Sequence, residues 1–497
     1  MELLKNYLQS NQGKFNPEMI AFVANLDLVA KADVSIAKSI VKEFVDQRSH
    51  LKLVASENFC SFSVQAAMGN LLTDKYAEGY PGNRFYAGCD NVDNIERFAI
   101  EEAKKLFGCE HAFVQPHSGA DANLVAFWAI LRKKVQEPIM ERLGYTDLLA
   151  ISKNEWDEIR SAMGNQKMLG MDLFSGGHLT HGYRHNASAQ MFDSYYYSVN
   201  KDTGLIEYEE IRNQLHEIKP LVLLAGYSAY TRSIDFSVMR KLADEVGAVL
   251  MVDMAHFAGL VAGGVMSGVY NPVPYADIVT TTTHKSLRGP RGGLVLCMSE
   301  YAEHVDKACP YIMGGPLPHV MAAKAIALKE ANTDEFKTYA KKILENSTEL
   351  AKALVERGIE VVTGGTDNHI VLVNVGGLEL TGRQAENALR ECRLTLNRNT
   401  VPFDKNGPWY TSGLRFGTCA VTTLGMGKDE MTEIADVIAK VLKNTHAEVS
   451  SKGARKKAAY KLDDSVREES IKRVKALMVK FVLYPQIDLE FLSKHLA

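Results

Sequence analysis

The sequence has few cysteines and no closely spaced pair of them. Only seven occur among 497 residues, and no two form a C-x-x-C motif. This scatter argues against a disulfide framework and against a zinc site, since both need cysteines at defined spacings. Isolated thiols are typical of proteins that stay in a reducing compartment. We therefore expect a cytoplasmic location and no bound metal.

The sequence also lacks long apolar runs and a strong excess of charge. Apolar runs such as LVLLAG (221–226) and AVLMV (248–252) are far shorter than a membrane-spanning helix. The first residues, MELLKNYLQSNQGKF, do not have the basic start and apolar centre of a signal peptide. The formal net charge is −3, so neither nucleic acid nor a membrane surface is an expected partner.

Glycine-rich nucleotide-binding motifs are absent as well. The sequence contains neither G-x-G-x-x-G nor G-x-x-x-x-G-K-[ST], so the dinucleotide-binding and P-loop interpretations have no support. No internal repeat or low-complexity tract occurs either. The composition, with 46% hydrophobic and 24% charged residues, is that of an ordinary globular protein. The length suggests about two or three domains.

Strands and helices alternate through the middle of the chain. Between about 110 and 300, short apolar segments are separated by helical ones, as where LVLLAG is followed by DFSVMRKLADEVG at 235–247. Near-continuous apolar strands separated by helices favour the α/β class, with a mostly parallel sheet covered on both faces.

Three parts of the chain are expected from this pattern. They are an N-terminal helical arm (1–55), a large domain (56–330) and a smaller α+β C-terminal domain (331–497). Within the large domain, residues 132–170 are charged and helical in character, and we expect them to form a surface insertion between sheet elements. We expect the charged stretch 450–481 to be helical.

The stretch DIVTTTTHKSLRGPRGG (277–293) carries the first candidate for catalysis, Lys285. Its β-branched threonines favour a strand, and its glycines allow the backbone to approach a ligand closely. A lysine is most often a solvated surface residue. At a strand end of an α/β sheet, however, it lies where ligands bind, and a buried lysine suits Schiff-base chemistry.

Schiff-base chemistry with pyridoxal phosphate (PLP) needs further groups, and the sequence offers a candidate for each. Asp253 follows an apolar strand and would keep the pyridine nitrogen protonated. An aspartate there is also a common helix N-cap, and the two interpretations are compatible. Ser118 and Gly119 precede a helical run, whose N-terminus binds phosphate. Arg415 and Arg291 are candidates for holding the carboxylate of an amino acid.

Two histidines follow paired glycines in SGGHLTHG (175–182). His178 and His181 are candidates for an aromatic side chain that covers the cofactor ring. Their H-x-x-H spacing is also compatible with a metal site, but no third ligand of matching pattern appears. We therefore favour the ring-covering role over a metal.

These segments are similar to serine hydroxymethyltransferase. The resemblance rests on eight motifs in the same order between about 50 and 425: LVASENF, KYAEGYPGNRFYAG, VQPHSGADAN, GGHLTHG, VDMAHFAGLVA, TTTTHKSLRGPRGG, GGTDNH and TSGLRFGT. It implies a fold-type I PLP-dependent transferase with a seven-stranded, mostly parallel sheet. It also implies reversible transfer of the serine hydroxymethyl carbon to tetrahydrofolate. That reaction gives glycine and 5,10-methylenetetrahydrofolate by retro-aldol-type Cα–Cβ cleavage.

The resemblance assigns roles to matching residues. Lys285 would form the PLP aldimine, Asp253 would pair with the pyridine nitrogen, and His178 would stack on the ring. The other cofactor contacts that it implies are Ser118, Gly119, Ser228, His256, His284, Tyr76 and Gly315. The substrate contacts that it implies are Ser56, Tyr86, Arg415 and Glu78.

Glu78 is the implied acid/base group at the substrate hydroxyl and folate. The implied folate contacts are Leu173, Gly177, His178, Leu179 and Asn399. In the family, the positions of Tyr76, Glu78, Tyr86 and Gly315 reach across a subunit boundary. The resemblance therefore implies a homodimer with shared active sites, or a tetramer built from two such dimers.

The sequence departs from the family pattern at a few places. Ala120 replaces a second serine after the phosphate-binding S-G, Asp121 replaces an amide, and Phe85 replaces a tyrosine. The segment CPYIMGGPL (309–317) and the expected insertion at 132–170 also differ. These differences concern cofactor retention and folate affinity more than the chemistry at Lys285.

Two alternatives use the same residues. A folate-independent enzyme, either threonine-aldolase-like or a racemase of small amino acids, would share the PLP machinery. Only the folate contacts discriminate, and Leu173, Leu179 and Asn399 favour the transferase. The second alternative is a PLP-binding structural or regulatory protein without turnover. A non-catalytic relative need not keep all four of the residues Lys285, Asp253, Arg415 and Glu78, which argues against it.

Overall fold

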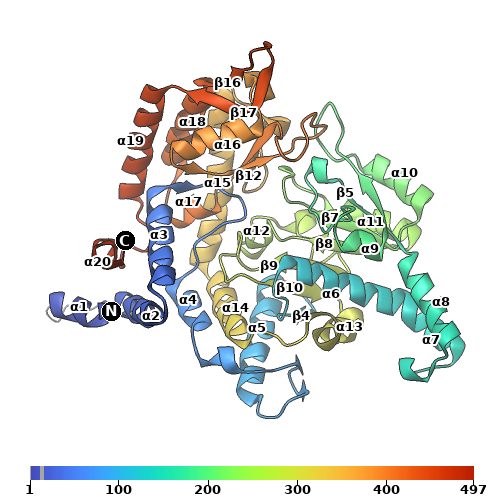
Figure 1. Ribbon diagram of the computed structural model, residues 1–497. Coiled ribbons are helices and arrows are strands. Elements are labelled where there is room, and N and C mark those ends of the chain that lie inside the picture. The colour runs from blue at the N-terminus through green and yellow to red at the C-terminus, as the bar shows by residue number, and fades with distance from the viewer. Residues whose placement is uncertain (1, 12–15, 497) are drawn as a thin grey trace.

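The computed structural model describes residues 2–11 and 16–496 and is built around a seven-stranded sheet (Figure 1). The strand order is β4-β10-β9-β8-β7-β5-β6. Only β10 runs antiparallel to its neighbours, so the predicted α/β class with a mostly parallel sheet is confirmed. The strands are β4 (His111–Phe113), β5 (Lys167–Met171), β6 (Asp193–Tyr197), β7 (Val222–Gly226), β8 (Val249–Asp253), β9 (Ile278–Thr282) and β10 (Gly293–Cys297).

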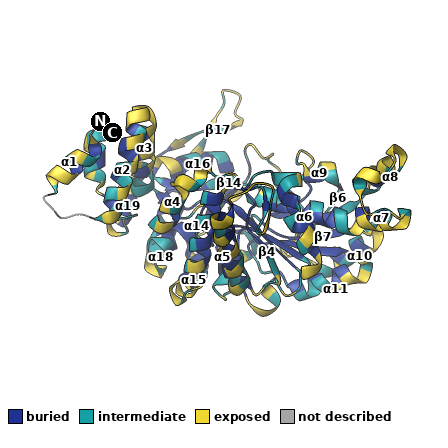
Figure 2. Ribbon diagram, turned by 90° about the horizontal axis from the view of Figure 1, so that it is seen from below, coloured by how far each residue is buried: buried dark blue, intermediate teal, exposed yellow. Residues whose placement is uncertain are grey.

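The central strands are buried on both faces, as their apolar runs predict (Figure 2). Along β8, Leu250 and Val252 belong to one core cluster, and Val249 and Met251 belong to another on the opposite face. The other strands of the sheet and the helices that cover it supply most of the rest of both clusters. The helices of this part are α4 (Phe62–Met68), α5 (Asp90–Phe107), α6 (Gly119–Leu131), α9 (Ser188–Met191), α10 (Tyr208–Ile218), α11 (Phe236–Val246), α12 (Ala258–Ala262), α13 (Ala302–Asp306) and α14 (Pro318–Ala331).

A second, antiparallel sheet lies in the C-terminal third of the chain. Its order is β11 (Glu360–Val361), β12 (Ile370–Asn374), β15 (Gly413–Gly417) and β14 (Asn397–Asn399). The helices packed around it are α15 (Asp334–Glu356), α16 (Gly382–Glu391), α17 (Cys419–Thr423), α18 (Lys428–Lys443) and α19 (Asp464–Lys480). β1 (Leu51–Lys52) pairs in parallel with β13 (Leu394–Thr395) and so ties the end of the N-terminal segment to this part.

The two ends of the chain lie side by side (Figures 1 and 2). Helices α1 (Leu3–Ser10), α2 (Pro17–Ala32) and α3 (Val34–Ser49) share a core cluster with α20 (Leu489–Leu496). We keep the boundaries 1–55, 56–330 and 331–497 as a proposal. The core clusters cross these boundaries, since Phe336 and Ile343 pack in the core of the large domain and Leu492 packs in that of the N-terminal helices. None of the helices in the described residues combines the length and apolar character that a membrane crossing requires.

Two expectations about secondary structure are wrong in part. Residues 132–170 begin with a π-helical turn (Arg132–Gln136) and contain α7 (Glu137–Leu143) and α8 (Lys153–Gly164), but Lys167–Met171 form β5 inside the central sheet. The insertion therefore ends before 167. The charged helical flank concealed a strand of only five residues.

The stretch 450–481 is helical only in its second half, α19. Its first half forms β17 (Arg455–Leu462), which pairs with β16 (Thr445–Val449). The side chain of Gln384 donates hydrogen bonds to the carbonyls of Lys456 and Ala459 at 2.8 and 2.7 Å. A tertiary contact thus stabilises a strand that its basic composition does not indicate.

Candidate functional site

One cavity gathers most of the predicted site residues. It has a volume of about 380 Å³ and receives side chains from the ends of β8 and β9, the start of α6 and strand β15. Two larger hollows, of about 500 and 710 Å³, are lined by none of the predicted residues. The predicted residues in the cavity are Ser56, Ser118, Gly119, His178, Ser228, Asp253, His256, His284, Lys285 and Arg415; Arg291 also lines it.

Asp253 is the last residue of β8 and is buried. Its Oδ2 accepts a hydrogen bond from Asn123 Nδ2 at 2.9 Å and lies 3.3 Å from His181 Nε2. Burial alone would raise its pKa, but these partners outweigh burial and hold the pKa well below its ordinary value. Asp253 therefore stays ionised. It caps no helix, because Oδ1 accepts from the N–H of Ala255 and the next helix, α12, begins at 258.

His181 contacts Asp253, and His178 lines the cavity. Burial, partly opposed by Asp253, lowers the pKa of His178 to about 4, so the ring is neutral. Its Nδ1 lies 2.7 Å from Thr180 Oγ1, which also accepts from Asn123 at 2.7 Å. In the described residues, no group of three or more His, Cys, Asp or Glu side chains is arranged to hold a metal ion.

Lys285 follows the end of β9 by three residues and is buried in the cavity wall. Burial lowers its pKa to about 8; Asp253 opposes that shift, while Arg415 and Arg291 add to it. Part of the amine is therefore neutral, and so nucleophilic, near neutral pH. The following loop folds back tightly, since Gly289 N–H donates to Thr283 O at 2.7 Å.

Ser118 and Gly119 open α6 at the edge of the cavity. Ser118 is the N-cap, and its Oγ accepts from the N–H of Asp121 at 3.1 Å. A Cβ on Gly119 would lie 2.7 Å from Thr282 Cγ2, so only glycine lets the helix start this close to β9. The Asp121 carboxylate turns away from the cavity and accepts from the N–H of His117 at 3.1 Å. A helix N-terminus attracts anions.

Arg415 reaches the cavity from β15. Its Nη1 donates to Ser228 O at 2.7 Å, and its Nε donates to Asn397 Oδ1 at 3.2 Å. Burial lowers its pKa to about 10, and within the described part of the chain it forms no ion pair. A guanidinium that faces a cavity without an acidic partner is suited to bind an anion from outside the chain.

Four predicted residues lie apart from this cavity and form a second cluster. The rings of Tyr76 and Tyr86 meet edge to face at 4.9 Å, and their residues are 54% and 49% exposed. Glu78 lies between them in sequence, and a Cβ on Gly315 would be 2.9 Å from Tyr76 Cζ. Within one chain, these residues do not line the cavity that contains Lys285.

Of the predicted folate contacts, only His178 lines the main cavity. Leu173 and His178 line a smaller hollow of about 180 Å³. Gly177 occupies a position where a Cβ would be 2.1 Å from Met171 O, and Leu179 is 45% exposed. Asn399 lies on β14, and its side chain donates to Thr400 O at 2.7 Å.

Sequence reasoning missed several residues that support the site. Asn123 and Thr280 form a buried link behind Asp253, and His369 stacks on His256 with Nε2 3.3 Å from His256 Nδ1. Asn123 and His369 lie within two of the quoted motifs, VQPHSGADAN and GGTDNH, and this position could have identified them as site residues. Lys324 is fully buried and donates to three backbone carbonyls, and its only signal was a lysine within an apolar helix.

The residues present fit PLP. The amine of Lys285 has a lowered pKa, the buried Asp253 is ionised, and a helix N-terminus together with Arg291 offers a place for a phosphate. The mostly parallel seven-stranded sheet has the cavity outside its strand ends. Fold and site together define a PLP-dependent enzyme of fold type I.

Comparison with known proteins identifies the family. The family described as serine hydroxymethyltransferase matches residues 29–142 and 161–438. A serine hydroxymethyltransferase of Treponema pallidum (strain Nichols) is 55% identical over 493 residues, covering 99% of this chain and 86% of that protein. One from Chlamydia trachomatis serovar D is 52% identical, covering 99% of both. One from Salinispora tropica is 51% identical over 474 residues, covering 95% of this chain and 99% of that protein.

The chain belongs to the serine hydroxymethyltransferase family and is a PLP-dependent one-carbon transferase. The predicted family, fold class and cofactor are thereby confirmed. The match to the family is interrupted at 143–160, between α7 and the middle of α8. The part outside the family pattern is thus shorter than the predicted 132–170.

Proposed function

We propose that the cavity around Lys285 is the site where this chain moves the hydroxymethyl carbon of serine to tetrahydrofolate. The observation that carries this proposal is that three chemically distinct groups line one cavity. Lys285 with a lowered pKa, the ionised Asp253 and Arg415 without an acidic partner all line it. An amine, an anion and a free guanidinium are what a cofactor aldehyde, a pyridine nitrogen and a substrate carboxylate need.

Bound PLP supplies an electron sink for the bonds at Cα of the amino acid. Lys285 would hold the cofactor covalently, and Asp253 would hold a proton at the ring nitrogen. The neutral ring of His178 would cover one face. Ser118 and Gly119 would hold the phosphate together with Arg291, which the sequence had offered instead as a candidate for the substrate carboxylate. Ser228, His256 and His284 lie where they would contact the rest of the cofactor.

Arg415 and Ser56 would bind the carboxylate of serine. Arg415 is fixed by hydrogen bonds to Ser228 O and Asn397 Oδ1, so its position does not depend on the ligand. Clamping the carboxylate restricts rotation about the bond from nitrogen to Cα. This restriction orients the Cα–Cβ bond for cleavage.

The cluster of Tyr76, Glu78, Tyr86 and Gly315 would complete the cavity of a second copy of the chain. Two half-exposed tyrosines beside a carboxylate, outside the chain's own cavity, support this assignment. Glu78 would then hold and move the proton of the substrate hydroxyl. The proposal includes a homodimer, or a tetramer built from two such dimers, in the cytoplasm. Leu173, Gly177, His178, Leu179 and Asn399 would contact folate.

A spectroscopic titration tests this function. The purified chain with PLP is expected to show a visible absorption band, and Lys285→Ala should lack the covalent form. Glycine and tetrahydrofolate added together should produce a strong new band that neither ligand gives alone. A band that never responds to folate would instead favour the aldolase-like or racemase alternative. Absence of any cofactor band in the wild-type chain would contradict the enzyme assignment. Lys329→Ala, an exposed lysine, is the control.

A further inference from the structure

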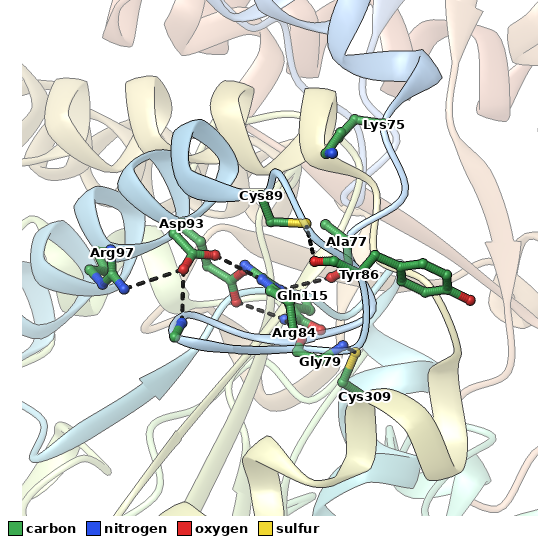
Figure 3. A network of polar contacts seen from close by, with 12 residues as sticks. Lys75, Ala77, Gly79, Arg84, Tyr86, Cys89, Asp93, Arg97, Gln115 and Cys309 are labelled. Carbon is green, nitrogen blue, oxygen red and sulfur yellow. Dashed lines mark hydrogen bonds and ion pairs between the residues drawn. The ribbon is translucent and has the colours of Figure 1, made fainter.

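We propose that Arg84 and Gln115 are positioning residues that fix the segment carrying Glu78. The inference rests on the proposed role of Glu78 at a substrate hydroxyl. Arg84 belongs to the short hairpin of β2 (Gly79–Tyr80) and β3 (Asn83–Arg84), and Glu78 directly precedes β2. Gln115 comes from the segment that leads to Ser118. Figure 3 shows the network that joins them.

Arg84 holds the backbone on both sides of Glu78. Its Nη1 donates to Ala77 O at 2.8 Å and to Gly79 O at 2.9 Å. These are the carbonyls of the residues directly before and after Glu78. Phe85 N–H also donates to the carbonyl of Glu78 at 3.0 Å. The guanidinium therefore fixes the direction in which the Glu78 side chain leaves the hairpin.

The guanidinium is itself held by two acidic groups of α5. Its Nε donates to Asp93 Oδ1 at 2.8 Å, and its Nη2 contacts Glu96 Oε2. The side chains of Arg84 and Glu96 are only 4% and 1% exposed. Asp93 also accepts from Gly82 N–H in the hairpin turn at 2.8 Å. Because this ion pair is buried and fully hydrogen-bonded, loss of either partner leaves a charge uncompensated.

Gln115 ties the same hairpin to the start of α6. Its Nε2 donates to Gly79 O at 2.8 Å and to Glu96 Oε1 at 2.7 Å, while its Oε1 is buried and finds no partner among the described residues. Both neighbours are acceptors, which fixes the orientation of the amide. The peptide after Glu78 is held from its other side too, because Gly79 N–H donates to Cys309 Sγ at 3.2 Å.

The network has no contact with the cavity of its own chain. None of Arg84, Gln115 and Glu96 lines that cavity, whereas Ser118, three residues after Gln115, does. The network could act in one of two ways: it could support cofactor binding in its own chain, or it could place Glu78 for the partner chain. These two roles make different predictions. The contacts to Ala77 O and Gly79 O favour the role in placing Glu78.

The first test compares Gln115→Met and Arg84→Met with Arg97→Met in the PLP-loaded enzyme. Arg97 also contacts Asp93, at 3.3 Å, but it is exposed and touches neither carbonyl. We expect kcat to fall by about 10- to 100-fold in the first two variants, as a small misplacement of a reacting group does. Serine KM and the cofactor band should stay close to wild type, and Arg97→Met should behave as wild type. Equal loss of cofactor and activity in Gln115→Met would contradict the proposal.

Mixed dimers, purified by means of a different affinity tag on each chain, give a second readout. This experiment uses Gln115→Met, so it does not depend on whether Arg84→Met folds. In a dimer of Gln115→Met with Lys285→Ala, the working cavity receives its hairpin from the Lys285→Ala chain. Near wild-type activity per working site is expected. When both substitutions are on one chain beside a wild-type chain, the working cavity receives the altered hairpin, and activity should fall as in the Gln115→Met homodimer. The reverse pattern, or no difference, would overturn the proposal.

Failure of the proposed function would look different. If Glu78→Gln has wild-type activity, the proposed acid/base role of Glu78 is wrong. If Glu78→Gln is inactive while Gln115→Met and Arg84→Met are fully active, the role of Glu78 stands and only the positioning role of Arg84 and Gln115 is wrong.

Discussion

At the scale of single residues, the site works through groups whose protonation the protein has shifted. Burial lowers the pKa of Lys285 to about 8, while hydrogen bonds keep Asp253 ionised in spite of its burial. Burial also lowers the pKa values of His178 and His284, to about 4 and about 3. The cavity therefore presents neutral rings, the ionised Asp253, the guanidinium groups of Arg415 and Arg291, and an amine that is partly free of its proton. Glu57 also lines the cavity, and burial raises its pKa.

The Lys285 shift predicts a pH dependence of cofactor attachment. Only the neutral amine attacks an aldehyde. The rate of PLP attachment to the apo chain should rise with pH through about 8 and level off above it. Stopped-flow absorbance measures this rate, and Lys285→Ala should lack the covalent phase. A rate that keeps rising to the pKa of an ordinary lysine, about 10.4, would contradict the shifted value.

Arg415 gives the second prediction at this scale. Arg415→Lys keeps the charge but loses the planar fork that holds a carboxylate. A lost charge-assisted hydrogen bond costs about 1.5–3 kcal/mol, which corresponds to a KM for serine that is roughly 10- to 160-fold higher. Steady-state kinetics checks this. Arg398 lies on the neighbouring strand β14 and pairs with Glu386 of α16, so Arg398→Lys should leave the KM unchanged. An unchanged serine KM in Arg415→Lys would contradict the proposed role of Arg415 in binding the carboxylate.

At the scale of elements, Lys324 of α14 holds the segments that frame the phosphate site. Its Nζ donates to Val114 O, Pro116 O and Gly293 O at 2.6, 2.8 and 2.9 Å. These carbonyls lie just before Ser118 and just after Arg291. A Cβ on Gly292 would be 2.4 Å from Lys324 Cε, so the loop closes directly over the lysine.

Lys324→Met should therefore lower both stability and cofactor retention. The substitution leaves three carbonyls without their donor, and each unsatisfied group costs about 1–3 kcal/mol. We expect a lower unfolding temperature and faster loss of PLP on dialysis. Lys329→Met, at an exposed position of the same helix, is the control. If Lys324→Met keeps both properties, the loop does not depend on this lysine.

The sequence allowed much of the site to be predicted because local patterns determined it. An apolar strand ending in Asp253 and a threonine run before Lys285 placed both residues at adjacent strand ends, β8 and β9. Contacts between distant segments could not be predicted from local patterns. Asn123 and Asp253 are 130 residues apart in the sequence, and Lys324 and Val114 are 210 residues apart. The strands β5 and β17 were missed, since charged neighbours dominated their patterns.

At the scale of the whole molecule, the exposed side chains on either side of the β2–β3 hairpin support the proposed dimer. Tyr76 and Tyr86 are half exposed, and Leu71, just before them, is 80% exposed. Exposed apolar side chains that gather on one segment mark a contact with another protein. In a twofold dimer each chain would give its hairpin to the other and receive one in return.

Complementation tests this exchange. Glu78→Gln and Lys285→Ala homodimers should both be nearly inactive. Chains of the two variants that are unfolded and refolded together should recover about a quarter of wild-type activity. Random pairing makes half of the dimers mixed, and one of the two cavities in each has both groups intact. Activity that stays at the level of the homodimers would show that Glu78 serves its own chain or none.

The most direct test of the whole account is the rate at which the PLP-loaded chain forms glycine from serine, with and without tetrahydrofolate. We predict rapid glycine formation that depends on tetrahydrofolate and yields 5,10-methylenetetrahydrofolate in equal amount. Lys285→Ala should form no glycine over many turnovers. Glycine formation at the same rate without tetrahydrofolate, or sustained turnover by Lys285→Ala, would contradict the account.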